Sequence, residues 1–289
     1  MVQEKEAQMN KQAEGFFSDS SSQPLISVIM GVYNCEKTVG EAIRCILDQT
    51  FTNWELIICD DGSSDATFGA VSAFQRDYPE KVRVMRNEAN KGLNLTLNRC
   101  LKEARGEYIA RMDGDDICSP DRFEKELKIL LENEDIDIVS TDMNYFDEAG
   151  EWGLLQHPKE PVFQDFMKES PFCHAPCMVR KEAYDAVDGY SEDPKTLRVE
   201  DYDLWIRMYA AGFRGRNIHE ALYSMRDDRN AYNRRKFKYR LNEAYVRLKA
   251  MRLFSLPVWN FVYVLRPVFV GLLPRFLYDF LHKKRLKKA

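Results

Sequence analysis

The feature that most constrains the fold is a regular alternation of short apolar runs and helical patterns between residues 25 and 141. The apolar runs are continuous and short, which is typical of strands that are buried on both faces of a parallel sheet. The predicted strands are residues 25–30, 54–59, 81–85, 107–112 and 135–141, and the predicted helices are residues 37–49, 66–78, 93–104 and 120–133. This order predicts an α/β fold with a mainly parallel, Rossmann-like sheet flanked by helices.

Two groups of acidic residues directly follow predicted strands. The segment CDDGSSD ends the second strand with Asp60 and Asp61, and RMDGDDI ends the fourth strand with Asp113, Asp115 and Asp116. Ligands of open α/β sheets bind beyond the carboxyl ends of the strands. We therefore expect the two groups to meet at one edge of the sheet and to form a ligand site there.

The first group has both a structural and a functional interpretation. A turn at Asp-Gly followed by a capped helix explains the residues from Gly62 to Asp65. It does not explain the adjacent Asp60 and Asp61 at the end of a buried strand. Their carboxylates can accept hydrogen bonds from the base N–H or the ribose hydroxyls of a nucleotide, so we treat both as candidate nucleotide ligands.

The second group points to a metal ion. Three carboxylates within four positions repel one another unless a cation neutralises them. Asp113 and Asp115 supply the oxygen ligands preferred by Mg²⁺ or Mn²⁺, ions that keep open positions for phosphate oxygens. The alternative is an acidic turn that caps the helix starting near Pro120. In either case, Asp116 is the carboxylate best explained by structure.

A third acidic motif lies farther along the chain, in RVEDYDLWIRM. Glu200, Asp201 and Asp203 stand at the start of a predicted helix whose apolar face includes Leu204 and Trp205. Acidic residues near a helix N-terminus are favourable because of the helix dipole alone, so a structural explanation remains open. Asp201 is nevertheless the best candidate for a general base that takes a proton from an attacking hydroxyl.

The two ends of the chain differ in character from its middle. Residues 1–23 are polar and Ser-rich, which predicts a disordered lead-in. Residues 229–289 are basic and amphipathic, and their longest uncharged run, residues 253–265, is shorter than the roughly 20 residues that span a bilayer. We expect these C-terminal helices to lie in the interface of an anionic membrane. The alternatives are packing on residues 24–228 or a true span.

Composition limits the partners and the compartment. The formal net charge of −4 gives no overall attraction to nucleic acid. The seven cysteines are odd in number and form no C-x-x-C pair, which indicates reduced thiols and a cytoplasmic protein. With the basic tail, this predicts peripheral attachment to the inner face of the cell membrane.

At its motifs the sequence resembles the family 2 glycosyltransferases, inverting enzymes with the nucleotide-sugar-binding GT-A fold. The resemblance runs from about residue 24 to residue 225 and rests on PLISVIMGVYN, ELIICDDGSSDAT, EYIARMDGDDICSPDRF, DGY and VEDYDLWIRM in this order. The C-terminal residues more loosely resemble the membrane-interface helices of members that build bacterial surface polysaccharides.

The resemblance implies a role for each matching residue. Tyr33 would stack near the nucleobase, Asp61 would bind the base with support from Asp60, and Asp201 would be the catalytic base. Gly31-Val32 stands where family members often carry Pro-Thr or a similar pair, so a backbone contact with the base is expected there rather than one from a side-chain hydroxyl. The remaining implied residues are Arg111 and Asp113 in the nucleotide-sugar site, Asp113 and Asp115 at the metal, and His174 and Glu200 near the acceptor.

The implied activity is transfer of a sugar from a nucleotide-diphosphate sugar, most simply a UDP-sugar, with Mg²⁺ or Mn²⁺. The acceptor would be a hydroxyl of a saccharide, lipid-linked as in capsule, O-antigen or exopolysaccharide assembly. One alternative is a membrane-tethered nucleotide-sugar-binding protein that has lost catalysis. Another is a sugar-phosphate nucleotidyltransferase, but GVYNCEKT lacks the Gly-rich, Arg-bearing loop that would hold a triphosphate.

Overall fold

The computed structural model describes residues 24–227 and 237–272. All five predicted strands and all four predicted helices of the first half are present. These elements are β1 (Ile26–Val32), α2 (Val39–Leu47), β2 (Trp54–Asp60), α3 (Thr67–Asp77), β3 (Val82–Arg86), α4 (Leu93–Glu103), β4 (Tyr108–Arg111), α5 (Arg122–Glu132) and β6 (Ile138–Asp147), with a two-residue strand β5 (Ile117–Cys118) before α5.

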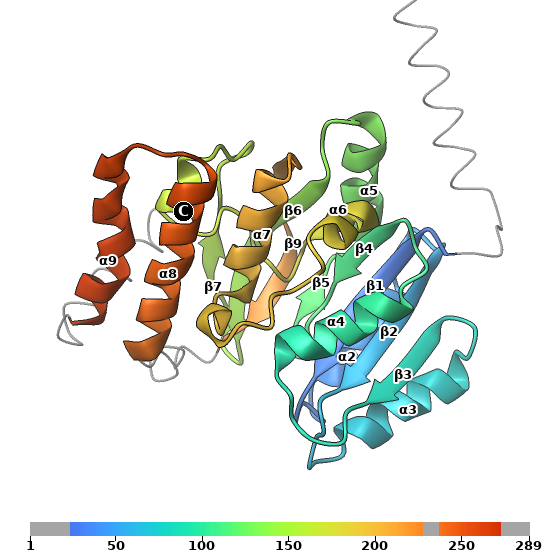
Figure 1. The fold of residues 1–289 in the computed structure, drawn as a ribbon. Helices are drawn as coiled ribbons and strands as arrows, with labels where there is room; N and C mark the ends of the chain where they lie inside the picture. Colours follow the sequence, from blue (N-terminus) through green and yellow to red (C-terminus); the bar gives the residue numbers. More distant parts are fainter. Residues whose placement is uncertain (1–23, 228–236, 273–289) are drawn as a thin grey trace, which may run out of the picture.

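The second half adds mostly shorter elements. They are β7 (Gly150–Leu155), η1 (Asp165–Met167), β8 (Met178–Arg180), α6 (Lys181–Ala186), η2 (Pro194–Thr196), α7 (Glu200–Ala210), β9 (Gly215–Arg226), α8 (Phe237–Leu253), η4 (Val258–Asn260) and α9 (Phe261–Gly271). Figure 1 shows α8 and α9 at one end of the molecule and β3 at the other.

The sheet has the order β3-β2-β1-β4-β8-β6-β9-β5, and β7 pairs with β6. Strand β1 pairs in parallel with β2 and β4, as the alternation of strands and helices predicts. Strand β8 is antiparallel to both of its neighbours, β4 and β6. The sheet is therefore mixed, with its parallel part intact, and three residues are too few for β8 to show a periodic pattern in the sequence.

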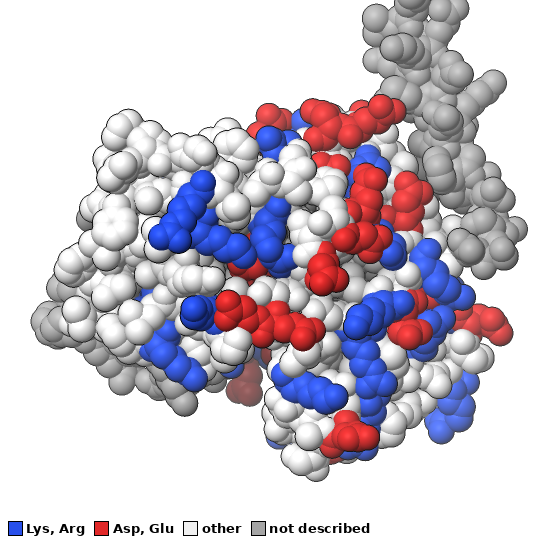
Figure 2. Space-filling view, viewed as in Figure 1, with Lys and Arg blue, Asp and Glu red and all other residues white. Residues whose placement is uncertain are grey.

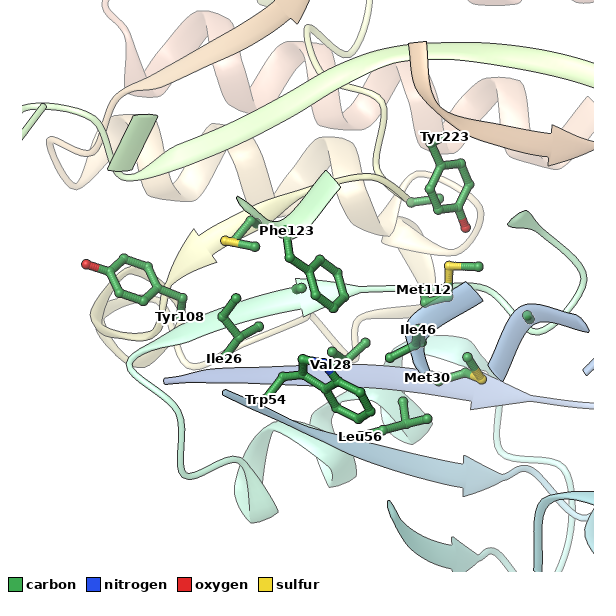
Figure 3. Packing of buried hydrophobic residues seen from close by; sticks show 14 of the residues in the cluster. Ile26, Val28, Met30, Ile46, Trp54, Leu56, Tyr108, Met112, Phe123 and Tyr223 are labelled. Atoms are coloured by element: carbon green, nitrogen blue, oxygen red, sulfur yellow. The ribbon is translucent and has the colours of Figure 1, made fainter. Parts of the chain in front are cut away.

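Helices cover both faces of the sheet, which explains the continuous apolar strands. Alternate strand residues enter different clusters: Val28 and Met30 pack with α2 and α5, whereas Ile29 packs with α4 and α7. Figure 3 shows the first cluster, where Phe123 of α5 lies over the β1 and β4 side chains. The second cluster continues outward through Val246 of α8.

The strand register brings the predicted ligand segments together at one sheet edge. Val32, the last residue of β1, pairs with Asp60 of β2, and β4 runs parallel to β1 on its other side. The amide of Asp61 donates to the carbonyl of Val32 at 2.8 Å. The Thr38 hydroxyl donates to the carbonyl of Gly114 at 3.0 Å. The two acidic loops thus flank the end of β1.

The C-terminal helices have an inner and an outer face. On the inner face, Val246, Ala250 and Val264 are buried in the second apolar cluster, so the packing alternative holds for part of the extension. The outer face exposes large apolar side chains, namely Val258, Trp259, Phe261, Val262, Leu265, Phe269 and Leu272. None of the described helices combines the length and the apolar character needed to cross a bilayer. The predicted lead-in 1–23 and the basic end of the chain lie outside the described residues.

A close backbone approach at Gly106 gives a test of the fold. A Cβ atom there would lie 2.5 Å from the Ser27 amide nitrogen and 2.8 Å from the Ile26 carbonyl carbon, both backbone atoms of β1. Gly106→Ala should therefore lower the free energy of unfolding by about 1–3 kcal/mol, as measured by urea denaturation. Gly69→Ala is the control, because no atom lies within 4 Å of its added Cβ. Equal stability of the two variants would contradict the packing.

Candidate active site

The loop after β1 carries the first candidate residues. The ring of Tyr33 is 49% exposed at the carboxyl edge of the sheet, where it can receive a planar group. Gly31 lies under α4, since an added Cβ would be 3.1 Å from Leu93 Cδ1. Asn34, with φ of 50°, joins this loop to the next one: its amide donates to Ser63 Oγ at 3.0 Å.

Asp60 is buried and organises the loop after β2. Its carboxylate accepts weakly from the Ser63 amide, at 3.3 and 3.4 Å, and pairs with the Arg86 guanidinium at 3.0 Å. This geometry agrees with a supporting role for Asp60. Sequence reasoning missed Arg86, because a single arginine at the end of β3 carries no local signal.

Asp61 is also buried, and it holds the loop that precedes α4. Its Oδ1 accepts from Asn87 Nδ2 and from the Lys91 amide, both at 2.8 Å, and its Oδ2 accepts from the Gly92 amide at 2.9 Å. Three donors therefore already use this carboxylate, which leaves capacity for about one more on Oδ2. The structural role was not foreseen from the sequence.

The DGDD segment leaves β4 with its carboxylates in different surroundings. Asp113 is partly exposed, and its Oδ1 accepts from Arg111 Nη2 at 2.5 Å. The Asp115 side chain reaches the surface, yet the surrounding protein and then the charge of Asp113 raise the pKa of its carboxyl. Gly114 permits the turn to approach β1, since a Cβ there would be 2.8 Å from Val32 Cγ1.

Asp116 has the structural role that the sequence indicates. Its carboxylate is buried and accepts from the Tyr223 hydroxyl at 2.9 Å and from the Arg226 amide at 2.8 Å. Burial, and then the charges of Asp113 and Asp115, raise the pKa of Asp116 to about 8. The Tyr223 hydroxyl also accepts from the Asp113 amide at 3.1 Å. Strand β9 thereby fixes both ends of the acidic turn, which no sequence motif had indicated.

Asp201 lies in the first turn of α7 and is partly buried. Burial, followed by the charge of Glu200, raises the pKa of Asp201 to about 6. Glu200 is buried beside it, and its Oε2 receives no hydrogen bond from the described residues. A carboxyl group with a pKa near neutrality suits a general base that works at cellular pH.

His174 is held as a neutral base by its surroundings. Its Nε2 lies 2.9 Å from the hydroxyl of Tyr190, which in turn lies 3.2 Å from the hydroxyl of Tyr184. Burial and then the positive charge of Arg111 lower the pKa of His174 well below its ordinary value. The contact with Tyr190, the tyrosine of the DGY motif, joins the His174 loop to the loop before η2.

One cation links these groups. Burial alone would lower the pKa of the Arg111 guanidinium, but Asp113 and, among more weakly acting groups, Asp201 raise it above its ordinary value. Arg111 in turn lowers the pKa of Asp201. Arg111 therefore lies close to both the DGD segment and the candidate base. Its side chain is 4% exposed, which suits holding Asp113 better than direct contact with a nucleotide.

The carboxylates of Asp113 and Asp115 are the candidate ligands of a divalent cation. No group of three or more His, Cys, Asp or Glu residues that could hold a metal occurs within residues 24–227 and 237–272. Asp115 and Asp113 are two carboxylates, and Mg²⁺ is usually bound by one or two carboxylates together with substrate phosphates. These residues fit an ion that is completed by its substrate rather than enclosed by protein.

Comparisons with known proteins define the class. The family model described as glycosyl transferase family 2 matches residues 27–188, and the chain belongs to this family. Its fold is of the expected GT-A type: TarS of S. aureus, crystallised with UDP-GlcNAc, superposes with a TM-score of 0.65 at 18% identity over 84% of this chain and 70% of that chain. The protein is thus a glycosyltransferase enzyme.

Proteins of similar length that resemble this chain are named as glycosyltransferases. The chain is 41% identical to a Bacillus subtilis protein named as a glycosyltransferase, EpsE, over 92% of this chain and 96% of that protein. It is 28% identical to the Escherichia coli UDP-Gal:alpha-D-GlcNAc-diphosphoundecaprenol beta-1,3-galactosyltransferase, over 93% of this chain and 99% of that protein. A mannosyltransferase of Pyrobaculum calidifontis, solved with GDP-Man and Mn²⁺, has a TM-score of 0.60 at 16% identity over 95% of this chain and 85% of that one.

The raised pKa of Asp201 predicts a pH-dependent effect on stability. Because the pKa is about 6 in the folded protein and 3.8 ordinarily, wild-type stability should fall as the pH rises from about 4 through 6. Asp201→Asn removes this loss. The free energy of unfolding of the variant should therefore exceed that of wild type by up to about 3 kcal/mol at pH 8 and by little at pH 4. Urea unfolding at several pH values measures the difference.

The control for this prediction is Asp77→Asn. The Asp77 carboxylate is mostly exposed. At both pH 4 and pH 8, the free energy of unfolding of this variant should therefore stay within about 0.5 kcal/mol of the wild-type value. A difference for Asp201→Asn that does not change between pH 4 and pH 8 would contradict the raised pKa.

Proposed function

We propose that this chain is an inverting, metal-dependent glycosyltransferase that moves a sugar from a nucleotide-diphosphate sugar to a hydroxyl of a saccharide acceptor. The observation that carries the proposal is the buried Arg111, which pairs with Asp113 at 2.5 Å and opposes part of the rise in the pKa of Asp201. One cation thus acts on both the DGD segment and the candidate base. TarS and the mannosyltransferase support a nucleotide-sugar donor, and a UDP-sugar is the simplest choice.

In this proposal each residue has a defined role. Tyr33 receives the base, and the remaining acceptor site on Asp61 binds one of its N–H groups. Asp115 and Asp113 hold Mg²⁺ or Mn²⁺, which when bound supplies positive charge to the departing nucleoside diphosphate. Asp201 takes the proton from the acceptor hydroxyl as this attacks the anomeric carbon from the side opposite the leaving group, and configuration inverts. Burial, and then the charge of Glu200, keep the pKa of Asp201 raised.

The acceptor is proposed to be lipid-linked, and the protein to be cytoplasmic and peripheral on the inner face of the cell membrane. The name of the Escherichia coli galactosyltransferase, which includes diphosphoundecaprenol, supports a lipid-linked acceptor. The apolar outer face of η4 and α9 supports contact with the membrane, and Figure 2 shows few charged residues over α9. The proposed division is a GT-A domain at 24–228 and a membrane-binding part at 229–289, with 1–23 as a lead-in.

The activity is tested by transfer from a panel of UDP-, GDP- and dTDP-sugars to a diphospholipid-linked saccharide, with Mg²⁺ or Mn²⁺. Asp201→Asn should lower transfer by about 10²–10⁴-fold and leave UDP affinity nearly unchanged, because it removes only the base. Asp115→Asn should weaken UDP binding in the presence of the metal and not in its absence. Asp185→Asn, an exposed carboxylate paired with Lys181, is the control and should behave as wild type. Full activity of Asp201→Asn would overturn the base assignment.

Membrane contact is tested by sedimentation with vesicles that contain about 30% anionic lipid. Trp259→Ser with Val262→Ser should reduce vesicle binding by about tenfold or more, because two exposed apolar side chains no longer enter the lipid. Val162→Ser is the matched control, since Val162 is equally exposed but lies outside α8 and α9. If the double variant binds vesicles as tightly as wild type, this face does not contact the membrane.

A further inference from the structure

A buried carboxylate on the catalytic helix has no place in the mechanism above. Asp203 of α7 has no exposed surface, and it is paired with two cations. Its Oδ1 lies 2.6 Å from Lys249 Nζ of α8, and its Oδ2 lies 2.7 Å from Arg207 Nε, one turn along α7. We call these three residues the Asp203 triad. Sequence reasoning explained Asp203 by the helix dipole alone, and the structure gives it two specific partners.

Helix geometry separates Asp203 from Asp201. Residues two positions apart in an α-helix are about 200° apart around the axis, so they face opposite ways. Asp201 lies within the electrostatic reach of Arg111, on the site side of α7. Asp203 contacts Lys249 of α8, on the outer side. The triad therefore holds the same turn of α7 from behind.

The Arg207 end of the triad reaches the loop that orders His174. Its Nη1 donates to the carbonyl of Val187 at 2.5 Å and its Nη2 to the carbonyl of Gly189 at 2.8 Å. This loop contains two residues with positive φ, Asp188 and Gly189, and leads directly to Tyr190. Arg207 thus connects the triad to the tyrosine that contacts His174.

The α8 end of the triad is fixed independently at further points. Asn242 Nδ2 donates to the carbonyl of Leu197, in the turn just before α7, at 2.9 Å. Arg247 is buried and donates to the carbonyls of Met167 and Lys168 at 3.0 and 2.8 Å. Polar contacts of α8 therefore reach both α7 and the segment that leads into it.

We propose that Lys249 and Asp203 are positioning residues for Asp201, and that α8, within the C-terminal part, is a working part of the active site, whereas η4 and α9 carry the apolar face assigned to the membrane. Apolar residues of similar size would fill the same space with no cost of burying charge. What the triad adds is a fixed direction: the ion pair with Lys249 and the two hydrogen bonds from Arg207 to the loop at 187–189 set the rotation and the height of α7. A displacement of about 1 Å in a catalytic group costs about 10²-fold in rate, so α8 controls turnover through α7.

This inference rests on the proposed function and is tested in the full chain with Lys249→Met. We expect kcat to fall by about tenfold or more while the donor KM and the UDP affinity change by less than about twofold, because only alignment is lost. Lys249→Arg should recover a large part of kcat, since a guanidinium can pair with Asp203. Lys102→Met, an exposed lysine of α4, is the control and should match wild type.

Hydrogen–deuterium exchange of residues 200–210 provides a readout that does not depend on activity. Exchange should be faster in Lys249→Met and unchanged in Lys102→Met. Unchanged kcat in Lys249→Met would overturn the inference. So would a parallel fall of kcat, UDP affinity and melting temperature, which indicates a general structural role. If Lys249→Met does not fold, Asp203→Asn, which preserves the side-chain shape, is measured by the same criteria. A wild-type protein without transfer from any donor would instead refute the proposed function.

Discussion

The ion pair between Arg111 and Asp113 is the interaction on which the candidate site depends. Five carboxyl groups, those of Asp113, Asp115, Asp116, Glu200 and Asp201, gather near the end of β4, and burial raises the pKa of three of them. The buried Arg111 guanidinium pairs with Asp113 and lowers the pKa of Asp115 and Asp201, so it offsets part of the repulsion. Because Arg111 stands on the last position of β4, the sheet itself fixes where the positive charge lies.

The local parts of this arrangement were predictable from the sequence. Buried strands, amphipathic helices and turn residues are short-range patterns, and parallel strands place their carboxyl ends at one edge. The contacts that fix the site are of another kind. Asp61 is satisfied by the amides of Lys91 and Gly92, and Asp116 by Tyr223, more than 100 positions away. No residue type or spacing indicates such partners, because they follow from how the chain returns to the sheet.

The C-terminal helices show the same limit in a different form. Their sequence is basic and amphipathic, which favours a membrane surface. Pattern reading counts every Lys and Arg as a solvated charge, yet Arg247 is buried and Lys249 pairs with a buried carboxylate. In the sequence, Arg247 and Lys249 count toward binding of anionic lipid. In the structure, both side chains face the rest of the domain instead. The apolar outer face of α9, by contrast, is what the composition indicates.

Tyr223 determines when the acidic turn is completed during folding of the chain. Its hydroxyl joins the Asp113 amide and the Asp116 carboxylate, so the acidic turn is complete only after β9 has joined the sheet. During synthesis at about 5–20 residues per second, β9 follows the turn by on the order of 5–20 s. During that interval β1, β2, β3 and β4 can pair, but the acidic turn still lacks its hydrogen bonds to Tyr223. The parallel part of the sheet can therefore form before the acidic turn is complete.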